Sequence, residues 1–197
     1  MKMFRLFSKP LMLLLTALIL CGCSKSKESQ FYLLTSLPPQ KSNHNFYHQL
    51  QIGIDEVNIP GSIKKNQLMI NQTPHHLNIE EFNQWAGPLD KNIMLVLTTN
   101  LSTLIPGSIV QSSPWDNKFH PNYHLQVGIS QFEIDIHGTS TLRAEYIIYH
   151  NEKLIHKGNA YYQSTIPVIS TEALVKSMNN NLTSLSKEIA RFFIKNK

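Results

Sequence analysis

The longest helical pattern lies at the end of the chain. Within residues 174–192, apolar residues recur at steps of three and four, which is the spacing of one buried helix face. Ser170 or Thr171 supplies a hydroxyl for the N-cap. The pattern therefore predicts a long C-terminal helix at about residues 171–195, with residues 179–181 on its polar face.

A second helical stripe follows Pro88. Proline suits the first turn of a helix because its missing N–H is not needed there, and Asp90 places a carboxylate near the positive end of the helix dipole. Pro106 and Gly107 end the pattern, which predicts a central helix at about residues 88–104. The stripe consists of Ile93, Leu97, Leu101 and Leu104.

Much of the remaining domain alternates apolar and polar residues, which is the period of a half-buried strand. The alternation slips by one position near Asp55, which predicts a β-bulge or a kink, and again near Ser130, which predicts a β-bulge. Short turns at Gly138 and Asn151 join the last three strands into an antiparallel meander. We expect strands at about residues 31–34, 50–59, 67–71, 75–79, 108–111, 125–136, 141–148 and 154–165.

These elements predict an α/β fold. We expect a mixed, largely antiparallel sheet with the central helix and the long C-terminal helix packed on it. Residues 31–197 form one domain in this interpretation, which is long enough to bury a sizeable core.

The first 22 residues have the pattern of an export signal. Lys2, Arg5 and Lys9 precede residues 11–20, which are apolar except for Thr16. A positive start followed by a short apolar segment is typical of a signal peptide, and the segment is too short to span a bilayer, which takes about 20 residues. A buried core helix is the alternative, but such a helix would show a polar face.

The end of the signal resembles the bacterial lipobox, with Leu20 at −3, Gly22 at −1 and Cys23 at +1. The resemblance implies that residues 1–22 are removed and that Cys23 carries fatty acyl chains such as palmitate. Cys21 is the competing acceptor, but it would place bulky Leu20 directly before the cut. Ser24 follows the lipidated cysteine, which in Gram-negative lipoproteins resembles an outer-membrane address.

The mature chain is nearly neutral and has no free thiol. Cleavage removes three of the 18 basic residues and none of the 13 acidic ones, which lowers the formal net charge from +5 to +2. No dense basic face remains for nucleic acid. Cys21 leaves with the signal and the lipid occupies the Cys23 sulfur, so no disulfide or cysteine metal site is expected. Residues 23–30 form a short lipidated tether without apolar residues after the cysteine.

No motif for catalysis, a metal or a cofactor emerges. His75 and His76 are adjacent, so on a strand they point to opposite faces. His120 and His124 have helical spacing, but Pro121 lies between them. The carboxylates Glu133 and Asp135 alternate with apolar residues, as on the solvated face of a strand. The sequence has no H-E-x-x-H, P-loop or nucleophile-elbow motif, so we expect no enzyme activity and no cofactor.

Several stretches together resemble a known family. The most specific is W-A-G-P-L-D at 85–90, which leads into the central helix. The chain is similar to the ABC-transport auxiliary lipoproteins, and within them to the paraquat-inducible C-like group, over nearly its whole mature length. The resemblance implies an α/β domain without catalytic residues that works beside mammalian-cell-entry proteins, which carry lipids between the two membranes. The other matching stretches are F-Y-L-L at 31–34, I-G-I at 52–54, V-N-I-P at 57–60, N-L-S at 100–102, L-I-P-G at 104–107, residues 125–132 and the C-terminal amphipathic helix.

The preferred hypothesis is an outer-membrane lipoprotein, anchored through Cys23 on the periplasmic face. It docks a mammalian-cell-entry protein as the auxiliary component of an intermembrane lipid transport system. Trp85 is the candidate partner contact, because tryptophan is enriched at interface hot spots, but a core tryptophan packed against the following helix explains it equally well. A tubular partner favours a ring, so self-association is a further expectation. The alternatives are a lipoprotein that itself binds a small apolar ligand or lipid, and one that binds peptidoglycan.

Overall fold

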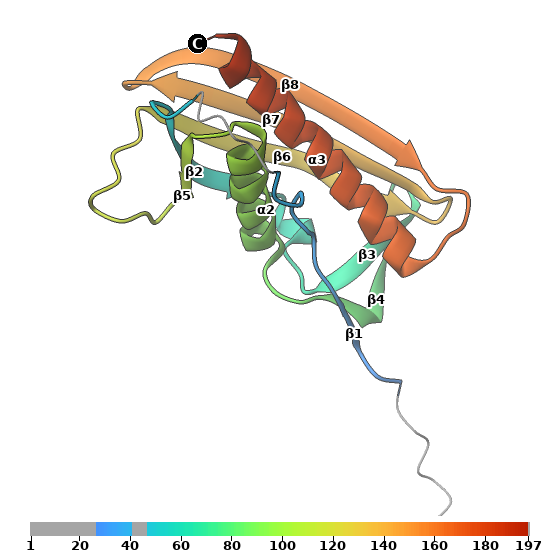
Figure 1. Ribbon diagram of the computed structural model, residues 1–197. Helices are drawn as coiled ribbons and strands as arrows, with labels where there is room; N and C mark the ends of the chain where they lie inside the picture. The colour runs from blue at the N-terminus through green and yellow to red at the C-terminus, as the bar shows by residue number, and fades with distance from the viewer. Residues whose placement is uncertain (1–26, 41–46, 197) are drawn as a thin grey trace, which may run out of the picture.

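The computed structural model describes residues 27–40 and 47–196 of the chain. The predicted signal, Cys23 and the start of the tether lie outside the described residues. The described part contains an eight-stranded mixed sheet and two α-helices (Figure 1). The strands are β1 (Gln30–Tyr32), β2 (Gln51–Asn58), β3 (Gln67–Thr73), β4 (His76–Trp85), β5 (Ile109–Ser112), β6 (Tyr123–Asp135), β7 (Thr139–His150) and β8 (Lys153–Thr165).

Strand β6 is the strand on which the whole sheet converges. Along one edge it pairs antiparallel with β7, which in turn pairs antiparallel with β8. Its other edge is shared: residues 123–128 pair in parallel with β2, whereas Ile134 and Asp135 pair in parallel with β3. Strand β5 extends the sheet beyond β2, while β4 and then β1 extend it beyond β3. The sheet therefore has two arms on this side of β6.

Helices α2 (Leu89–Leu104) and α3 (Thr171–Lys195) pack against the sheet and against each other (Figure 1). Ser170 Oγ accepts the N–H of Ala173 at 3.2 Å, which makes Ser170 the N-cap of α3. Within the described residues, neither helix combines the length and apolarity needed to cross a bilayer. Both helices lie close to where the spacing predicted them.

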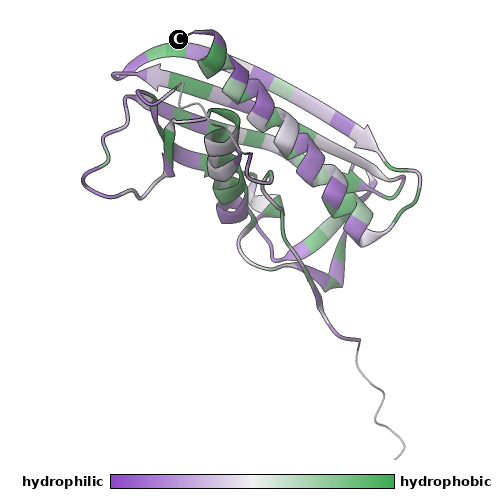
Figure 2. Ribbon diagram, viewed as in Figure 1, coloured by the Kyte–Doolittle hydropathy of each residue, from purple (hydrophilic) through white to green (hydrophobic). Residues whose placement is uncertain are grey.

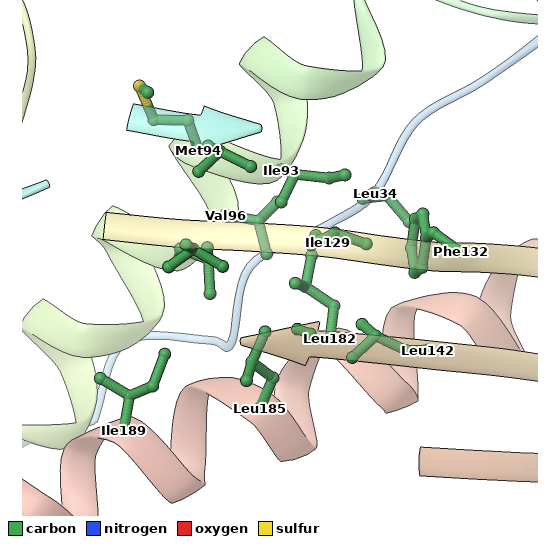
Figure 3. Packing of buried hydrophobic residues seen from close by; sticks show 14 of the residues in the cluster. Leu34, Ile93, Met94, Val96, Ile129, Phe132, Leu142, Leu182, Leu185 and Ile189 are labelled. Atoms are coloured by element: carbon green, nitrogen blue, oxygen red, sulfur yellow. The ribbon is translucent and has the colours of Figure 1, made fainter. Parts of the chain in front are cut away.

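The apolar stripes of the two helices meet the inner face of the sheet in one core. Figure 3 shows Ile93 of α2 and Leu182 of α3 with Ile129 and Leu142 of the sheet between them, and all four are buried. In Figure 2 the strands and helices show alternating hydrophobic and hydrophilic residues, as elements with one buried face do. The predicted α/β class, with a mixed and mostly antiparallel sheet, is confirmed.

Both predicted bulges are confirmed. The register of β2 against β6 shifts between Ile54 and Glu56, and that of β6 against β7 shifts between Ile129 and Gln131. The turn residues also agree with the prediction, because Gly138 has φ of 80° and Asn151 has φ of 47°. Each bulge moves the apolar residues that follow it back to the core face.

Two sequence-based predictions need correction. Strand β4 reaches Trp85, well beyond the predicted end at about residue 79, and its register against β3 shifts in the polar stretch before Gln84. Asn181 was placed on the polar face of the last helix but is buried. Its Nδ2 donates to the carbonyl and hydroxyl oxygens of Ser140, and its Oδ1 accepts from Ser164 at 2.8 Å. These hydrogen bonds offset the cost of burying an amide.

One position of the meander must be glycine because an aromatic ring fills the space where a side chain would stand. Gly158 of β8 pairs with Tyr146 of β7. A Cβ atom at Gly158 would overlap the Tyr146 ring, which covers the bare backbone at this position. The Tyr146 ring of β7 therefore packs directly on the backbone of Gly158 in β8.

We predict that Gly158→Ala lowers the free energy of unfolding by about 1–3 kcal/mol, the usual cost of overpacking a filled core. Urea denaturation of the mature domain measures this change. The matched control is Gly128→Ala on β6, where an added Cβ meets nothing within 4 Å. A similar loss of stability in both variants would contradict the steric explanation.

Candidate anchoring and docking site

The segment after β1 runs as an extended strap between the two helices. We define the strap as residues 33–40, which follow β1 and belong to no helix or strand. Leu34 is buried and points toward Ile93 and Phe132 in Figure 3. The N–H of Leu34 donates to Asn92 Oδ1 at 2.7 Å, and Asn92 Nδ2 donates back to the Leu34 carbonyl at 3.2 Å. The Asn92 amide therefore binds the strap as a neighbouring strand would.

Two more asparagines hold the strap further along. The N–H of Thr35 donates to Asn179 Oδ1 on α3 at 2.9 Å. The N–H of Leu37 donates to Asn100 Oδ1 on α2 at 2.7 Å, and Asn100 Nδ2 donates to Ser186 Oγ on α3 at 3.0 Å. Asn100 is fully buried, so it links the strap to both helices at once.

The chain before the strap is tied to the sheet. Tyr32 pairs with Trp85 in the parallel β1–β4 ladder, and the Tyr32 carbonyl accepts the N–H of Ala86 at 2.8 Å. Lys27 Nζ lies 5.5 Å from the centre of the Phe82 ring. The predicted lipidation residue Cys23 stands only seven positions before Gln30, so the described domain fixes the chain almost up to the proposed anchor.

Trp85 lies in the core beside this junction. Its side chain is 6% exposed and belongs to the apolar cluster between sheet and helices. It lines a space of about 20 Å³ together with Leu89, Phe132 and Met178. This placement fits the core role that the sequence left open for Trp85, while its contact with a partner stays a prediction.

A polar groove of about 820 Å³ opens where the β3–β4 turn lies near β6 and β7. It is on the face of the sheet away from the core, since Glu133 alternates along β6 with buried Phe132 and Ile134. Asn71 Nδ2 donates to Glu133 Oε2 at 2.8 Å. Within the described residues, no three His, Cys, Asp or Glu side chains are placed to hold a metal ion. The groove is lined by Asn71, Gln72, Thr73, Pro74, His75, His76, Leu77, Gln131, Glu133, Ile134, Asp135, His137, Thr139 and Thr141.

The parallel β2–β6 pairing also brings together two residues that the sequence analysis treated separately. His124 Nδ1 lies 2.8 Å from Asp55 Oδ1. The Trp115 ring lies 5.9 Å from the His124 ring and packs over Gly53, where a Cβ would come within 2.9 Å of it. The pair is part of a small cluster that fastens the loop after β5 to the sheet. Sequence spacing gave no indication of it, because 69 positions separate His124 from Asp55.

The buried Tyr146 and the half-buried Tyr162 share the carboxylate of Glu188 on α3. Tyr146 Oη donates to Glu188 Oε1 at 3.1 Å, and Tyr162 Oη donates to Glu188 Oε2. Burial, with smaller contributions from Glu188, raises the pKa of Tyr146 to about 12, and burial and the hydrogen bond to Glu188 raise the pKa of Tyr162. Both phenols therefore stay protonated at neutral pH and tie α3 to β7 and β8.

The fold and the strap define a class of protein: an α/β domain that fixes its own N-terminal segment between two helices. The family model for the ABC-type transport auxiliary lipoprotein component matches residues 32–190. The chain belongs to this family, which confirms the resemblance of the W-A-G-P-L-D stretch and its companions. The family is one of transport auxiliary lipoproteins and not of enzymes.

Two relatives agree with the family assignment, and two solved structures share the fold. The intermembrane transport lipoprotein PqiC of Escherichia coli strain K12 is 25% identical over 144 residues, which cover 73% of this chain and 75% of that protein. PqiC of Shigella flexneri matches to the same extent. Protein XCC0632 from Xanthomonas campestris superposes with a TM-score of 0.67 at 15% identity, covering 82% of this chain and 93% of that one. An uncharacterized protein of known crystal structure superposes with a TM-score of 0.72 at 22% identity, covering 85% of this chain and 99% of that one.

We predict that Asn100→Ala releases the strap locally. The substitution leaves the half-buried N–H of Leu37 without its side-chain acceptor. The cost is at most about 1–3 kcal/mol, the penalty for a fully buried group. Hydrogen exchange should therefore accelerate at Leu37 more than in the strands of the sheet.

The control for this variant is Asn180→Ala, which removes an exposed amide from α3. Exchange at Leu37 should be unchanged in that protein. If Asn100→Ala accelerates exchange uniformly over the whole domain, the local role of Asn100 in holding the strap is wrong.

We predict that stability falls as the pH rises from about 10, where tyrosines of an unfolded chain ionise, to about 12, where Tyr146 ionises in the folded protein. A raised pKa means that the unfolded state loses its proton first, so this stabilisation is complete below pH 10 and disappears through pH 12. Tyr146→Phe should show a decline shallower by up to about 1.4 kcal/mol per pH unit. Urea denaturation at several alkaline pH values measures this decline. Tyr161→Phe, at a largely exposed position of β8, should keep the wild-type slope, and equal slopes in all three proteins would rule the explanation out.

Proposed function

We propose that this chain is a lipoprotein anchored through Cys23 to the periplasmic face of the outer membrane. In this proposal residues 1–22 are the signal peptide, residues 23–30 the lipidated tether, and residues 31–197 the single auxiliary domain. The lipobox-like end of the signal and Ser24 after the cysteine support this placement. Each buried CH₂ of an acyl chain adds about 0.8 kcal/mol of membrane affinity, so several chains hold the protein almost permanently.

The domain serves as the auxiliary component of a mammalian-cell-entry-type intermembrane lipid transport system and acts by docking partner proteins. The family match and the intermembrane transport lipoprotein PqiC support this role. The observation that carries the proposal is the strap, held by Asn92, Asn100 and Asn179 between two packed helices. A short tether attached to a rigid strap holds the domain close to one place on the bilayer, which suits a protein that positions others.

Two spaces in the domain, beside Trp85 and beside the β3–β4 turn, favour docking over binding of a small apolar ligand or lipid there. The space beside Trp85 measures about 20 Å³, which is close to the volume that one water needs. The groove of about 820 Å³ is open and lined mostly by polar side chains, whereas lipid-sized ligand sites are mostly apolar and bury their ligand. Neither space has the character of a lipid pocket.

The test uses cells that carry the chain at its natural level. We predict that the wild-type protein fractionates with the outer membrane and that a mammalian-cell-entry protein co-purifies with it after crosslinking in intact cells. Ser24→Asp should move the protein to the inner membrane and strongly reduce the crosslinked product, because it changes the residue that directs sorting without touching the domain.

Ser24→Thr is the matched control and should leave both location and crosslinking unchanged. Cys23→Ser should release the protein from the membrane. Absence of any mammalian-cell-entry protein among the crosslinked partners of the wild type would count decisively against docking, and an outer-membrane fraction without the wild-type protein would exclude the proposed location.

A further inference from the structure

The loop between β8 and α3 exposes consecutive apolar residues. Residues 166–169 read Ile-Pro-Val-Ile, and Val168 is 73% and Ile169 53% exposed. The loop appears green, hence hydrophobic, in Figure 2. Ile136, beside the β6–β7 turn, is also exposed. A run of exposed apolar residues of this length is unfavourable in water unless another surface covers it.

This loop is firmly held by the β6–β7 turn. The N–H of Ile166 donates to the Gly138 carbonyl at 3.0 Å. Gly138 has φ of 80°, and a Cβ there would lie 2.9 Å from the Ile166 carbonyl oxygen and 3.2 Å from Ile169 Cγ1. Only glycine fits this close approach. The packing keeps the loop against the turn while Val168 stays exposed.

The loop is also free of charge over an unusual length. Between Lys157 and Glu172 the chain contains no Asp, Glu, Lys, Arg or His. Ionisable side chains resist transfer out of water much more strongly than the hydroxyls and amides of this stretch. The loop can therefore leave water without burying a charge.

The described chain that leads from the proposed anchor into the domain lies at the same end of the molecule. Thr35 of the strap is bound by Asn179, about two turns from the start of α3 at Thr171. In Figure 1, β1 lies nearer the end of the molecule where α3 begins than the end where it finishes. The seven chain steps from Cys23 to Gln30 reach at most about 25 Å. A tether of this length allows the acyl chains of the proposed anchor to enter the bilayer on the side of the domain where α3 begins.

We propose that residues 166–169, together with Ile136, insert into the interface of the phospholipid bilayer that holds Cys23. This inference rests on the proposed lipid anchor and deepens it. By themselves, the acyl chains fix the position of the domain at the membrane but not its orientation, because a seven-residue tether permits the domain to rotate. A second apolar contact fixes the orientation of the domain. It directs the N-terminal end of β8, at Lys153, away from the membrane.

The test places one environment-sensitive fluorophore on the chain. The lipidated mature protein has no free thiol once Cys23 is acylated, so Val168→Cys provides a single labelling position. The labelled protein is reconstituted in vesicles of phosphatidylethanolamine and phosphatidylglycerol that contain nitroxide-labelled lipid. We expect a blue shift and strong quenching of the label at this position.

Leu154→Cys is the matched control, because Leu154 is 51% exposed and lies near the opposite end of β8. Its label should show neither a shift nor quenching. Equal signals from the two positions, or a water-like signal from the Val168 position, would overturn the inference. A blue shift that grows with protein concentration in the absence of vesicles would assign the loop to a contact with a second copy and overturn it as well.

A second preparation separates this inference from the anchor. The mass of the mature N-terminus reports whether Cys23 is acylated, independently of the fluorophore. The Cys23→Ser chain, produced without residues 1–22 and labelled at Val168→Cys, should respond to vesicles only at high lipid concentration. If Cys23 proves unmodified, the proposed lipid anchor is wrong, and this preparation then tests whether the loop contacts the bilayer. A label that remains water-like at saturating vesicle concentration then excludes the loop contact.

Discussion

The strap crosses the domain without a strand beside it, so its backbone N–H and C=O groups need other hydrogen-bond partners. The arrangement of the two helices depends on supplying these partners. A buried N–H without a partner is costly, and an extended segment cannot satisfy its own. Asparagine carries both a donor and an acceptor on a short side chain, so it can serve as a substitute for a neighbouring strand. Asn92 does this from both of its amide atoms, and Asn100 does so while joining α2 to α3. The helices must therefore stand on either side of the strap.

The same hydrogen bonds determine how a force on the N-terminal segment passes into the domain. A pull on the tether acts first on the β1–β4 pairing and then on the strap, whose hydrogen bonds lead into α2 and α3. Beyond these contacts lies the main core, where Leu34 packs against residues of α2 and β6 (Figure 3). In a protein attached at its N-terminus, this arrangement distributes load over the core.

Sequence predicted well whatever depends on local periodicity, and poorly whatever depends on distant neighbours. The slips near Asp55 and Ser130 identified both bulges, because alternation reports directly which face a residue occupies. The His124–Asp55 contact was missed because parallel pairing joins segments that are far apart in the chain. Strand β4 was cut short because the residues after Ile79 are mostly polar and show no sustained apolar alternation. Asn181 was misplaced although it follows Met178 by three positions and precedes Leu185 by four, which is the spacing of the buried stripe. That spacing was the available signal, but polarity was given more weight.

The two faces of the sheet differ in how far they are covered, and this difference bears directly on the proposed docking. The face that carries α2 and α3 is occupied by the core and by the strap, so a partner cannot enter there without displacing the strap. The opposite face carries the polar groove beside the β3–β4 turn and the loop fastened through Trp115. Polar surface of this kind suits a partner that is recognised by hydrogen bonds and released without disturbing the core. In the proposed function, the strap that leads to the anchor and the surface that would meet a partner therefore lie on opposite faces of the sheet.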